Sequence, residues 1–241
     1  MALTVEAAGR TDVGLVRRRN EDSLYTGRYL FAVADGLGGH VAGDIASSTV
    51  IEALKPYDRP FAESDLSNAL GQAVRDANTA LGERIRAEPG VTGMGTTLVA
   101  MLWSGSKYVL ANVGDSRAYV IHDGAPRCLT PLTEDHIYGN LMSDAADVPN
   151  LPPRLARFLD GRADGRSPDL TVRNLRADDR FLLCSDGLSP VVPDDLIQAT
   201  LSTPGAPDET AEHLVQQAID HSGPDNVTVI VADCRNHSGD G

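Results

Sequence analysis

Short apolar runs, separated by turn residues, recur along the chain and predict β-strands. The runs are rich in Val, Leu, Tyr and Phe and are bounded by Gly, Asp or Pro, as strands and their connections usually are. Asp123-Gly124 directly follows one run and is a strong signal for a hairpin turn. The predicted strands are residues 3–8, 29–34, 96–102, 108–113, 118–122, 170–175, 181–185 and 227–232.

Three other segments repeat their apolar residues at the spacing of an amphipathic helix. They are residues 42–54, residues 65 to about 87, and residues from about 209 to 220. Ser64 and Asp208 are the expected N-caps of the second and third helix, and Pro89 and Gly223 follow their ends. Because strands and helices do not alternate regularly, the pattern favours an α+β fold with antiparallel strands over a doubly wound parallel sheet.

Composition narrows the class of protein. The 241 residues are 41% hydrophobic and 23% charged, which is the balance of an ordinary globular protein with enough chain for one sizeable core. The net charge of −13 leaves no basic surplus for displacing counterions from a nucleic-acid backbone. A nucleic-acid partner is therefore not expected.

No apolar stretch approaches the roughly 20 residues that a membrane helix needs, and the first residues lack the basic start and apolar centre of a signal peptide. We therefore expect a cytoplasmic protein with no membrane partner. The three cysteines, Cys128, Cys184 and Cys234, form no Cys-x-x-Cys pair, and none has an arginine six residues later. These spacings exclude a zinc knuckle, a disulfide scaffold and a cysteine-phosphatase loop, and Cys184 is expected to be a small core residue.

The candidate chemistry lies in aspartates that occupy the ends of predicted strands beside a turn residue. Asp35, Asp115 and Asp186 each end an apolar run, and Asp225 precedes one. One such corner by itself is ordinary turn chemistry. Several carboxylates gathered at strand ends repel each other unless a cation neutralises them. Oxygen ligands without thiolate or imidazole partners suit Mg²⁺ or Mn²⁺ rather than Zn²⁺ or Cu²⁺.

These corners belong to longer sequence blocks that run through most of the chain. The blocks are Thr11-Asp-Val-Gly-Leu-Val-Arg17-Arg-Arg-Asn20-Glu21-Asp22, Ala34-Asp35-Gly36-Leu-Gly38-Gly39-His40, Gly93-Met-Gly95-Thr96-Thr97, Gly114-Asp115-Ser116-Arg117, Leu183-Cys-Ser-Asp186-Gly187-Leu188 and Gly223-Pro-Asp225-Asn226-Val-Thr228-Val. In their order and surroundings the chain resembles the protein phosphatase type 2C family of metal-dependent protein phosphatases, and its bacterial branch in particular.

The resemblance implies a four-layer α-β-β-α sandwich, with two antiparallel sheets flanked by helices and a metal site between the sheets. It also implies a phosphoserine/phosphothreonine protein phosphatase, in which a water or hydroxide bridging two Mn²⁺ or Mg²⁺ ions hydrolyses the phosphate monoester. The catalytic domain is expected to cover residues 1–235, with a flap at about 133–168, and residues 236–241 are expected to form a disordered tail.

The resemblance assigns the metal ligands position by position. Asp35 matches the carboxylate that bridges the two metals, and the carbonyl of Gly36 is a ligand beside it. Asp186 and Asp225 match the acids that complete the first metal. These residues are the expected centre of the site.

Further residues of the resemblance surround this centre. Glu21 and Asp22 match an acidic pair that holds metal-bound waters. Asp115 matches an acid that helps to bind a third, weaker metal in bacterial relatives. Arg17 matches the arginine that binds the substrate phosphate, a task that suits its guanidinium fork. His40 is a candidate proton donor beside the Asp35 loop.

The chain departs from the family pattern in two places. Leu37 stands where many eukaryotic members have a histidine after Asp-Gly, so the general-acid role of that histidine does not transfer. Between residues 132 and 169 the chain keeps Thr133-Glu134-Asp135-His136 and then diverges, with prolines that predict a shorter and stiffer flap. The choice of target protein therefore does not carry over from the family.

Two alternatives to an active phosphatase remain open. A catalytically inactive family member, acting as a binding or scaffold module, would typically have lost metal acids that this chain keeps. A serine esterase is suggested by Gly114-Asp115-Ser116-Arg117, but no histidine has an aspartate three residues before it, as that class requires.

The expected partners of an active enzyme are phosphorylated proteins, among them a serine/threonine kinase, and the chain is expected to be a monomer. Arg18 and Arg19 are interpreted as solvated loop charges that can help to attract anionic substrates.

Overall fold

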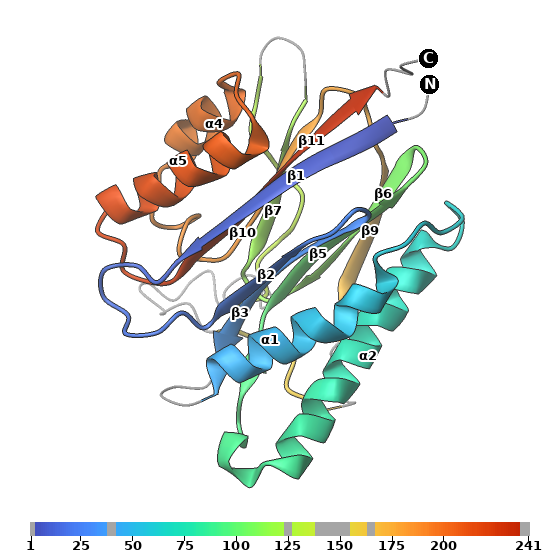
Figure 1. Cartoon of the computed structure of the whole chain (residues 1–241), viewed down its shortest axis with the longest axis vertical. Coiled ribbons are helices and arrows are strands. Elements are labelled where there is room, and N and C mark those ends of the chain that lie inside the picture. The colour runs from blue at the N-terminus through green and yellow to red at the C-terminus, as the bar shows by residue number, and fades with distance from the viewer. Residues whose placement is uncertain (1–2, 38–41, 123–126, 138–154, 163–166, 237–241) are drawn as a thin grey trace, which may run out of the picture.

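Two antiparallel β-sheets packed against each other form the centre of the molecule (Figure 1). The computed structural model describes residues 3–37, 42–122, 127–137, 155–162 and 167–236. One sheet has the strand order β1 (Leu3–Asp12), β11 (Val227–Asn236), β10 (Arg180–Cys184), β7 (Arg117–Ile121) and β8 (Thr130–Pro131). The other has the order β2 (Asp22–Thr26), β3 (Leu30–Leu37), β5 (Leu98–Ser104), β6 (Lys107–Val113) and β9 (Asp169–Asn174), and β4 (Gly95–Thr96) also pairs with β3.

The two faces of each central strand are buried in different layers. In β3, Leu30, Ala32 and Ala34 face the helices, whereas Phe31 and Val33 face the opposite sheet. This alternation follows from the two-residue period of a strand. It also explains why β3 reads as an uninterrupted apolar run, since neither of its faces meets water.

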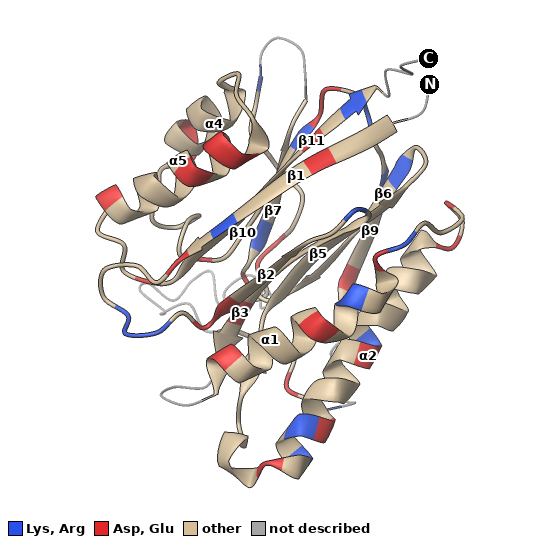
Figure 2. Cartoon of the chain, in the orientation of Figure 1, with Lys and Arg blue, Asp and Glu red and all other residues tan. Residues whose placement is uncertain are grey.

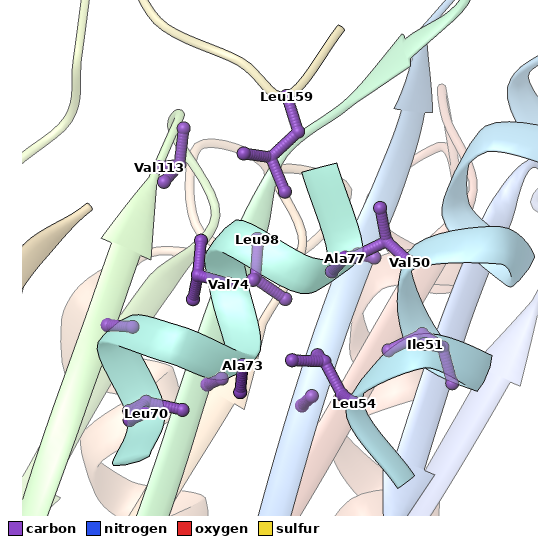
Figure 3. Packing of buried hydrophobic residues seen from close by; sticks show 14 of the residues in the cluster. Val50, Ile51, Leu54, Leu70, Ala73, Val74, Ala77, Leu98, Val113 and Leu159 are labelled. Atoms are coloured by element: carbon purple, nitrogen blue, oxygen red, sulfur yellow. The ribbon is translucent and has the colours of Figure 1, made fainter. Parts of the chain in front are cut away.

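Helices cover the outer face of each sheet. α1 (Gly43–Leu54) and α2 (Leu66–Ala87) cover the six-stranded sheet, and Figure 3 shows Leu54 and Val74 among the side chains that they pack together with Leu98. α4 (Asp194–Ser202) and α5 (Pro207–Asp220) cover the five-stranded sheet, against which they pack Ile197 and Leu214. Two short 3₁₀ turns, η1 (Lys55–Tyr57) and η2 (Pro89–Val91), follow α1 and α2. The predicted α-β-β-α sandwich is therefore confirmed.

Three elements lack a clear sequence signal and are not among the predicted ones. β2 is short and mostly polar, and β8 has only two residues. α4 has nine residues and buries only Ile197 and Leu201. β1 is longer than the predicted 3–8, because it pairs with β11 along its whole length. Elements of this kind are defined by their partners in space rather than by local periodicity.

Both predicted N-caps are wrong, by one residue for α2 and by two residues for α5. The N-cap of α2 is Asp65, and Ser64 lies one residue outside the helix, where its hydroxyl donates to the Asp65 carboxylate. α5 begins at Pro207 after Ala206, so Asp208 lies in the first turn rather than at the cap. Proline is favoured at the first helical position because its missing N–H needs no partner there.

Some expectations fall on parts of the chain that the structure does not describe. The hairpin signal Asp123-Gly124 lies outside the described residues, although β7 and β8 on either side of it do pair antiparallel. Residues 138–154 and 163–166 of the expected flap and residues 237–241 of the expected tail also lie outside them, whereas Asn236, the first residue of that tail, is the last residue of β11. Cys184 is fully buried, as expected. No helix in the described part of the chain has the length and apolar character that crossing a membrane requires.

Candidate active site

Acidic residues from both sheets meet at one end of the sandwich. Asp22 begins β2 and lies directly opposite Asp35 of β3 in the antiparallel register. In the other sheet, Asp186 follows the end of β10 and Asp225 precedes the start of β11. The strand ends thus bring together carboxylates that are far apart in sequence.

A pocket of about 640 Å³ opens at this point, and it brings together six of the predicted site residues. Its lining includes Arg17, Glu21, Asp35, Gly36, Asp186 and Asp225. Asp22 lies behind the lining and is only 9% exposed. Asp115 is outside the lining too, but its charge acts on Asp35. His40 lies outside the described residues, so its role as proton donor stays a prediction.

The carboxyl groups hold more negative charge than their surroundings can neutralise. Burial, then repulsion from Asp22 and Asp186, then a hydrogen bond shared with Asp186, raise the pKa of Asp35 well above its ordinary value. Burial is also the main cause that raises the pKa of Asp22 to about 6 and that of Asp115 to about 6. The pKa of Asp186 is raised by burial and by the charge of Asp225. Repulsion of this kind is relieved when one carboxyl group takes up a proton or when a cation binds between them.

Two buried carboxylate oxygens also have no hydrogen-bond partner in the described structure. They are Oδ1 of Asp22 and Oδ1 of Asp186. The other oxygen of Asp22 accepts a hydrogen bond of 2.8 Å from the hydroxyl of Ser185. A buried acceptor without a donor is costly, so each orphaned oxygen requires an explanation such as a metal ion or a water.

The backbone at Asp35 is held rigidly by two threonines. Thr97 Oγ1 accepts the Asp35 N–H at 3.0 Å, and both Thr96 Oγ1 and the Thr97 N–H donate to the Asp35 carbonyl, at 2.8 and 2.9 Å. Thr97 also pairs with the Ser116 hydroxyl at 2.7 Å. Ser116 is fully buried, which leaves it no access to a substrate. The serine-esterase alternative therefore lacks a usable nucleophile.

Gly36 allows a close approach that no other residue could make. A Cβ atom at this position would lie 2.1 Å from the Gly43 carbonyl oxygen and 2.6 Å from that of Glu21. The Gly36 N–H donates to the same Glu21 carbonyl at 3.1 Å. The start of α1 is thereby pressed against the end of β3, and Gly36 lines the pocket.

Arg17 reaches the site from the loop between β1 and β2. Its Nη2 lies 2.5 Å from Oδ2 of Asp225, and the side chain is 53% exposed. The hydrogen bond with Asp225 is the main reason that the pKa of Arg17 is raised. Its other guanidinium N–H groups have no partner among the described residues, so they can donate to an anion in the pocket.

The described site residues supply suitable ligand atoms, but their side chains are not already arranged around a metal position. In the described part of the chain, no group of three Asp, Glu, His or Cys side chains is already arranged to hold a metal ion. The two buried oxygens without a partner and the raised pKa values nevertheless indicate that the ionised carboxylates have too little positive charge near them. The donors are all oxygens, including the Gly36 carbonyl, which is the ligand chemistry of Mg²⁺ and Mn²⁺. The residues present therefore fit a divalent cation.

Comparison with known proteins decides the family. The sequence profile of protein phosphatase 2C matches residues 18–222. The chain belongs to the protein phosphatase 2C family.

Curated relatives within the family include bacterial serine/threonine phosphatases. The chain is 43% identical over 240 residues to the serine/threonine protein phosphatase PstP of Mycobacterium tuberculosis, a match that covers 97% of this chain and 46% of PstP. The chain thus spans about half the length of this relative. It is 32% identical to the serine/threonine phosphatase stp of Listeria monocytogenes, with 95% of this chain and 96% of that protein covered.

Solved structures agree with this placement. A crystal structure of the PstP catalytic domain in complex with two manganese ions has a TM-score of 0.87 and 43% identity, and the match covers 97% of this chain and all of that one. The phosphatase MsPP of Mycobacterium smegmatis, solved with cacodylate, has a TM-score of 0.79 and 33% identity, with 95% of this chain and 98% of that one covered.

Three residues of this phosphatase-family site carry roles that the sequence did not reveal. Ser185 binds Asp22 and also accepts the Thr228 N–H at 3.0 Å. The side chain of Asn226 donates to two carbonyls of the loop after β1 and accepts the Glu21 N–H at 2.8 Å. For both residues, the signal available in the sequence was that a polar residue stands next to a predicted metal ligand.

The third of these residues is His136, which is 1% exposed. Its Nδ1 accepts the Gly114 N–H at 3.1 Å, so Nε2 carries the proton and donates to Asp169 at 2.9 Å. His136 therefore joins the turn that carries Asp115 to the start of β9. The sequence shows that His136 belongs to the retained segment Thr133-Glu134-Asp135-His136, but it does not show that the side chain is buried.

Proposed function

We propose that this protein is a metal-dependent phosphatase that hydrolyses phosphoserine and phosphothreonine in proteins. The observation that carries the proposal is the convergence of Asp35, Asp186 and Asp225 from both sheets on one pocket that also contains Arg17, with Asp22 directly behind its lining. Family membership and the names of the bacterial relatives support it. The inactive alternative is not favoured, because every predicted metal acid is retained.

We assign the metal ligands as the sequence predicts. Asp35 would bridge two ions, with the Gly36 carbonyl beside it, and Asp186 and Asp225 would complete the set. When bound, two Mn²⁺ or Mg²⁺ ions supply Lewis-acid chemistry, which lowers the pKa of water and neutralises charge on the phosphate. The two orphaned oxygens and the all-oxygen donor set support this assignment, as does the manganese complex of the PstP domain.

Residues around these ligands support and orient them. Asp22 is fixed by Ser185 and would act on the ions through water, together with Glu21, whose carboxylate lines the pocket. Asp115 would hold a third, weaker ion, and its buried position next to the charge of Asp186 supports this role. A rigid set of supporting hydrogen bonds keeps the ligands close to their working geometry.

Arg17 would bind the phosphate of the substrate. Its guanidinium lines the pocket beside Asp225, is more than half exposed, and has donors without partners among the described residues. Two parallel N–H groups match two phosphate oxygens, and they stabilise charge that develops during transfer. Hydrolysis by water requires no protein nucleophile, which agrees with the burial of Ser116.

The proposal also covers the biological setting. The substrates would be phosphorylated proteins, including a serine/threonine kinase, and the enzyme would act in the cytoplasm as a monomer. The relatives named as serine/threonine phosphatases support the class of substrate. The kinase, the cytoplasmic location and the monomeric state are inferred from the sequence.

The test is hydrolysis of a phosphothreonine peptide and of p-nitrophenyl phosphate in Mn²⁺, in Mg²⁺ or in EDTA. Asp186→Asn keeps the shape of a proposed ligand and removes its charge, and we expect it to lower kcat/KM by at least about a hundredfold. Asp194→Asn, an exposed residue in the first turn of α4, is the matched control and should keep full activity. Turnover that persists in EDTA or in Asp186→Asn would refute the metal assignment.

A further inference from the structure

The loop between β1 and β2 forms a rim of the active-site pocket. Val16, Arg17, Arg18 and Arg19 line the pocket together with the acidic residues. Leu15 and Val16 are 66% and 68% exposed, and Arg18 and Arg19 are exposed as well. This rim, residues 13–19, therefore presents apolar and basic side chains at the entrance to an acidic site.

The rim is held in one conformation by contacts with the segment before β11. A single side-chain amide, Nδ2 of Asn226, donates to the carbonyls of Val13 and Arg19, at 2.9 and 2.8 Å. The Leu15 N–H donates to the Gly223 carbonyl at 2.8 Å. Because both ends of the rim are bound to one residue, its exposed side chains are displayed on a fixed backbone.

Gly14 makes this docking possible. It has a φ of +76°, and a Cβ there would lie 2.2 Å from the Asp225 carbonyl oxygen. The rim is thus pressed against the residue that pairs with Arg17. A fixed backbone lowers the entropy that a bound partner must remove, which is a property of a recognition surface.

The charge of the rim is opposite to that of the molecule as a whole. The chain has a net charge of −13, yet three successive arginines lie here, and Figure 2 shows the basic stretch in the loop that joins β1 to β2. Arg17 is paired with Asp225. Within the described residues, the side chains of Arg18 and Arg19 form no ion pair or hydrogen bond, whereas Arg117 and Arg180 pair bidentately with Asp135 and Asp233. Adjacent unpaired cations repel each other, and an anionic partner relieves this repulsion.

We propose that Arg18 and Arg19 select phosphoprotein segments that carry acidic side chains close to the phosphorylated residue. The inference rests on the proposed function, because it places the phosphate at Arg17. Consecutive Cα atoms lie about 3.8 Å apart and an extended peptide advances about 3.3 Å per residue, so the two guanidinium groups reach side chains within about three residues of the phosphate. Leu15 and Val16 supply apolar surface for the same segment, which explains why two adjacent large aliphatic residues are left exposed.

The experiment compares three phosphothreonine peptides that differ only in the three residues on each side of the phosphothreonine, which are Glu, Ala or Lys. kcat/KM is measured with Mn²⁺ for the wild type and for R18Q/R19Q, with p-nitrophenyl phosphate as a substrate without flanking residues. We expect the wild type to prefer the Glu peptide over the Ala peptide by about threefold to tenfold, and the double variant to lose most of this preference. The preference should also shrink between about 50 and 300 mM NaCl, because the charges are exposed.

A matched control variant distinguishes the effect of the rim residues from the effect of a change in net charge. R86Q/R173Q removes the same two charges from exposed residues that do not line the pocket, and it should keep the wild-type preference. L15S/V16S should raise KM for all three peptides while the ratio between the Glu and Ala peptides stays the same.

The outcomes distinguish the inference from the proposed function. Equal preference in the wild type and R18Q/R19Q, or no preference for the Glu peptide in the wild type, would overturn the inference and leave the phosphatase assignment intact. Absence of turnover on every substrate, p-nitrophenyl phosphate included, would overturn both.

Discussion

At the residue scale, one hydroxyl group connects the two halves of the site. Ser185 follows β10 in one sheet, and its Oγ donates to Asp22 of β2 in the other at 2.8 Å. The same oxygen accepts the Thr228 N–H of β11 at 3.0 Å. All three groups are buried or nearly so. The orientation of Asp22 therefore depends on a residue that is not itself a proposed ligand.

Ser185→Ala should destabilise the protein by about 1–3 kcal/mol, because it leaves a buried N–H without an acceptor and removes a donor from a buried carboxylate. Urea unfolding followed by circular dichroism measures this change. Ser48→Ala is the control, since its exposed hydroxyl bonds only to carbonyls within α1, and it should change stability by less than about 0.5 kcal/mol. Equal stability of Ser185→Ala and the wild type would contradict the connecting role.

At the element scale, α2 carries a docking site for residues 155–162. Asn78 of α2 accepts the Gly161 N–H at 2.9 Å and donates to the Arg162 carbonyl at 2.7 Å. Gly82, one turn further along, faces the same segment, and a Cβ there would lie 2.6 Å from the Gly161 carbonyl oxygen. The segment also places Leu159 in the core against β4 (Figure 3). The end of the divergent region is thus fixed to the domain.

Gly82→Ala and Gly71→Ala form a matched pair within α2. Alanine normally stabilises a helix interior by about 0.5–1 kcal/mol relative to glycine. At Gly71 the added methyl group meets only flexible side-chain ends, so Gly71→Ala should be neutral or stabilising. At Gly82 it meets backbone, so Gly82→Ala should destabilise by about 1–3 kcal/mol. Thermal unfolding of both variants checks the difference, and the same sign for both would argue against the docking site.

Local sequence patterns predict some helices and strands of this fold and miss others. The long runs of β3, β5 and β6 and the helical period of α2 were predicted because each buries a regular face in a core. β2, β8 and α4 were not predicted, because they are short and their stability comes from neighbours rather than from their own pattern. The predicted strand 96–102 is divided between β4 and β5 at Thr97, although both pair with β3 in the same register and the Thr97 N–H still donates to the carbonyl of Asp35 opposite it. The reciprocal bond differs, because the Asp35 N–H donates to the Thr97 hydroxyl, a side-chain contact that the strand pattern does not predict.

At the scale of the whole molecule, part of the negative charge is removed from water. The chain has 34 acidic and 21 basic residues, and at one end of the sandwich Asp22, Asp35, Asp115 and Asp186 are desolvated enough for burial to raise their pKa values. Burial raises the pKa of Asp22 to about 6, compared with roughly 3.9 in an unfolded chain. A carboxyl group whose pKa is raised by folding binds its proton more tightly in the folded state. Its contribution to stability is therefore largest at low pH and falls as the pH rises from about 4 to about 6.

In EDTA, we expect the melting temperature to be higher at pH 5 than at pH 7.5, because Asp22 and Asp115 are then largely protonated. For Asp22 alone the difference between pH 5 and pH 7.5 corresponds to roughly 1.4 kcal/mol, because only about one unit of the pKa shift lies above pH 5. Asp22→Asn should reduce this dependence on pH. Calorimetry at a series of pH values measures the effect, and a melting temperature that does not change over this range in EDTA would contradict it.

Mn²⁺ should stabilise the protein most strongly at neutral pH, whereas the metal-free protein is expected to be more stable at low pH. A ligand present at about 100 times its dissociation constant stabilises the folded state by about 2.7 kcal/mol. We expect Mn²⁺ to raise the melting temperature at pH 7.5 more than at pH 5, where protons compete for the same carboxylates. Asp186→Asn should lose most of this shift. An equal shift in wild type and variant would place the Mn²⁺ site elsewhere.

The sequence by itself determined the family, the α+β class and the identity of the acids at the strand ends, because these depend on local patterns. A buried strand is apolar along its length, a helix repeats its apolar residues at its own period, and Asp-Gly and Asp-Asn corners mark where strands end. The corners pointed to Asp35, Asp186 and Asp225, the resemblance to the phosphatase family added Arg17 and Gly36, and the structure brings all five to one pocket.

Only the tertiary structure decided which groups face each other and which hydrogen bonds hold them. Ser185 and Asp22 are 163 positions apart in the chain, and Asn226 and Val13 are 213 apart. Such contacts depend on sheet register and on the packing of two sheets, and no local pattern encodes either. The burial that raises the carboxyl pKa values, the fixed rim of residues 13–19 and the role of His136 all arise from this long-range packing.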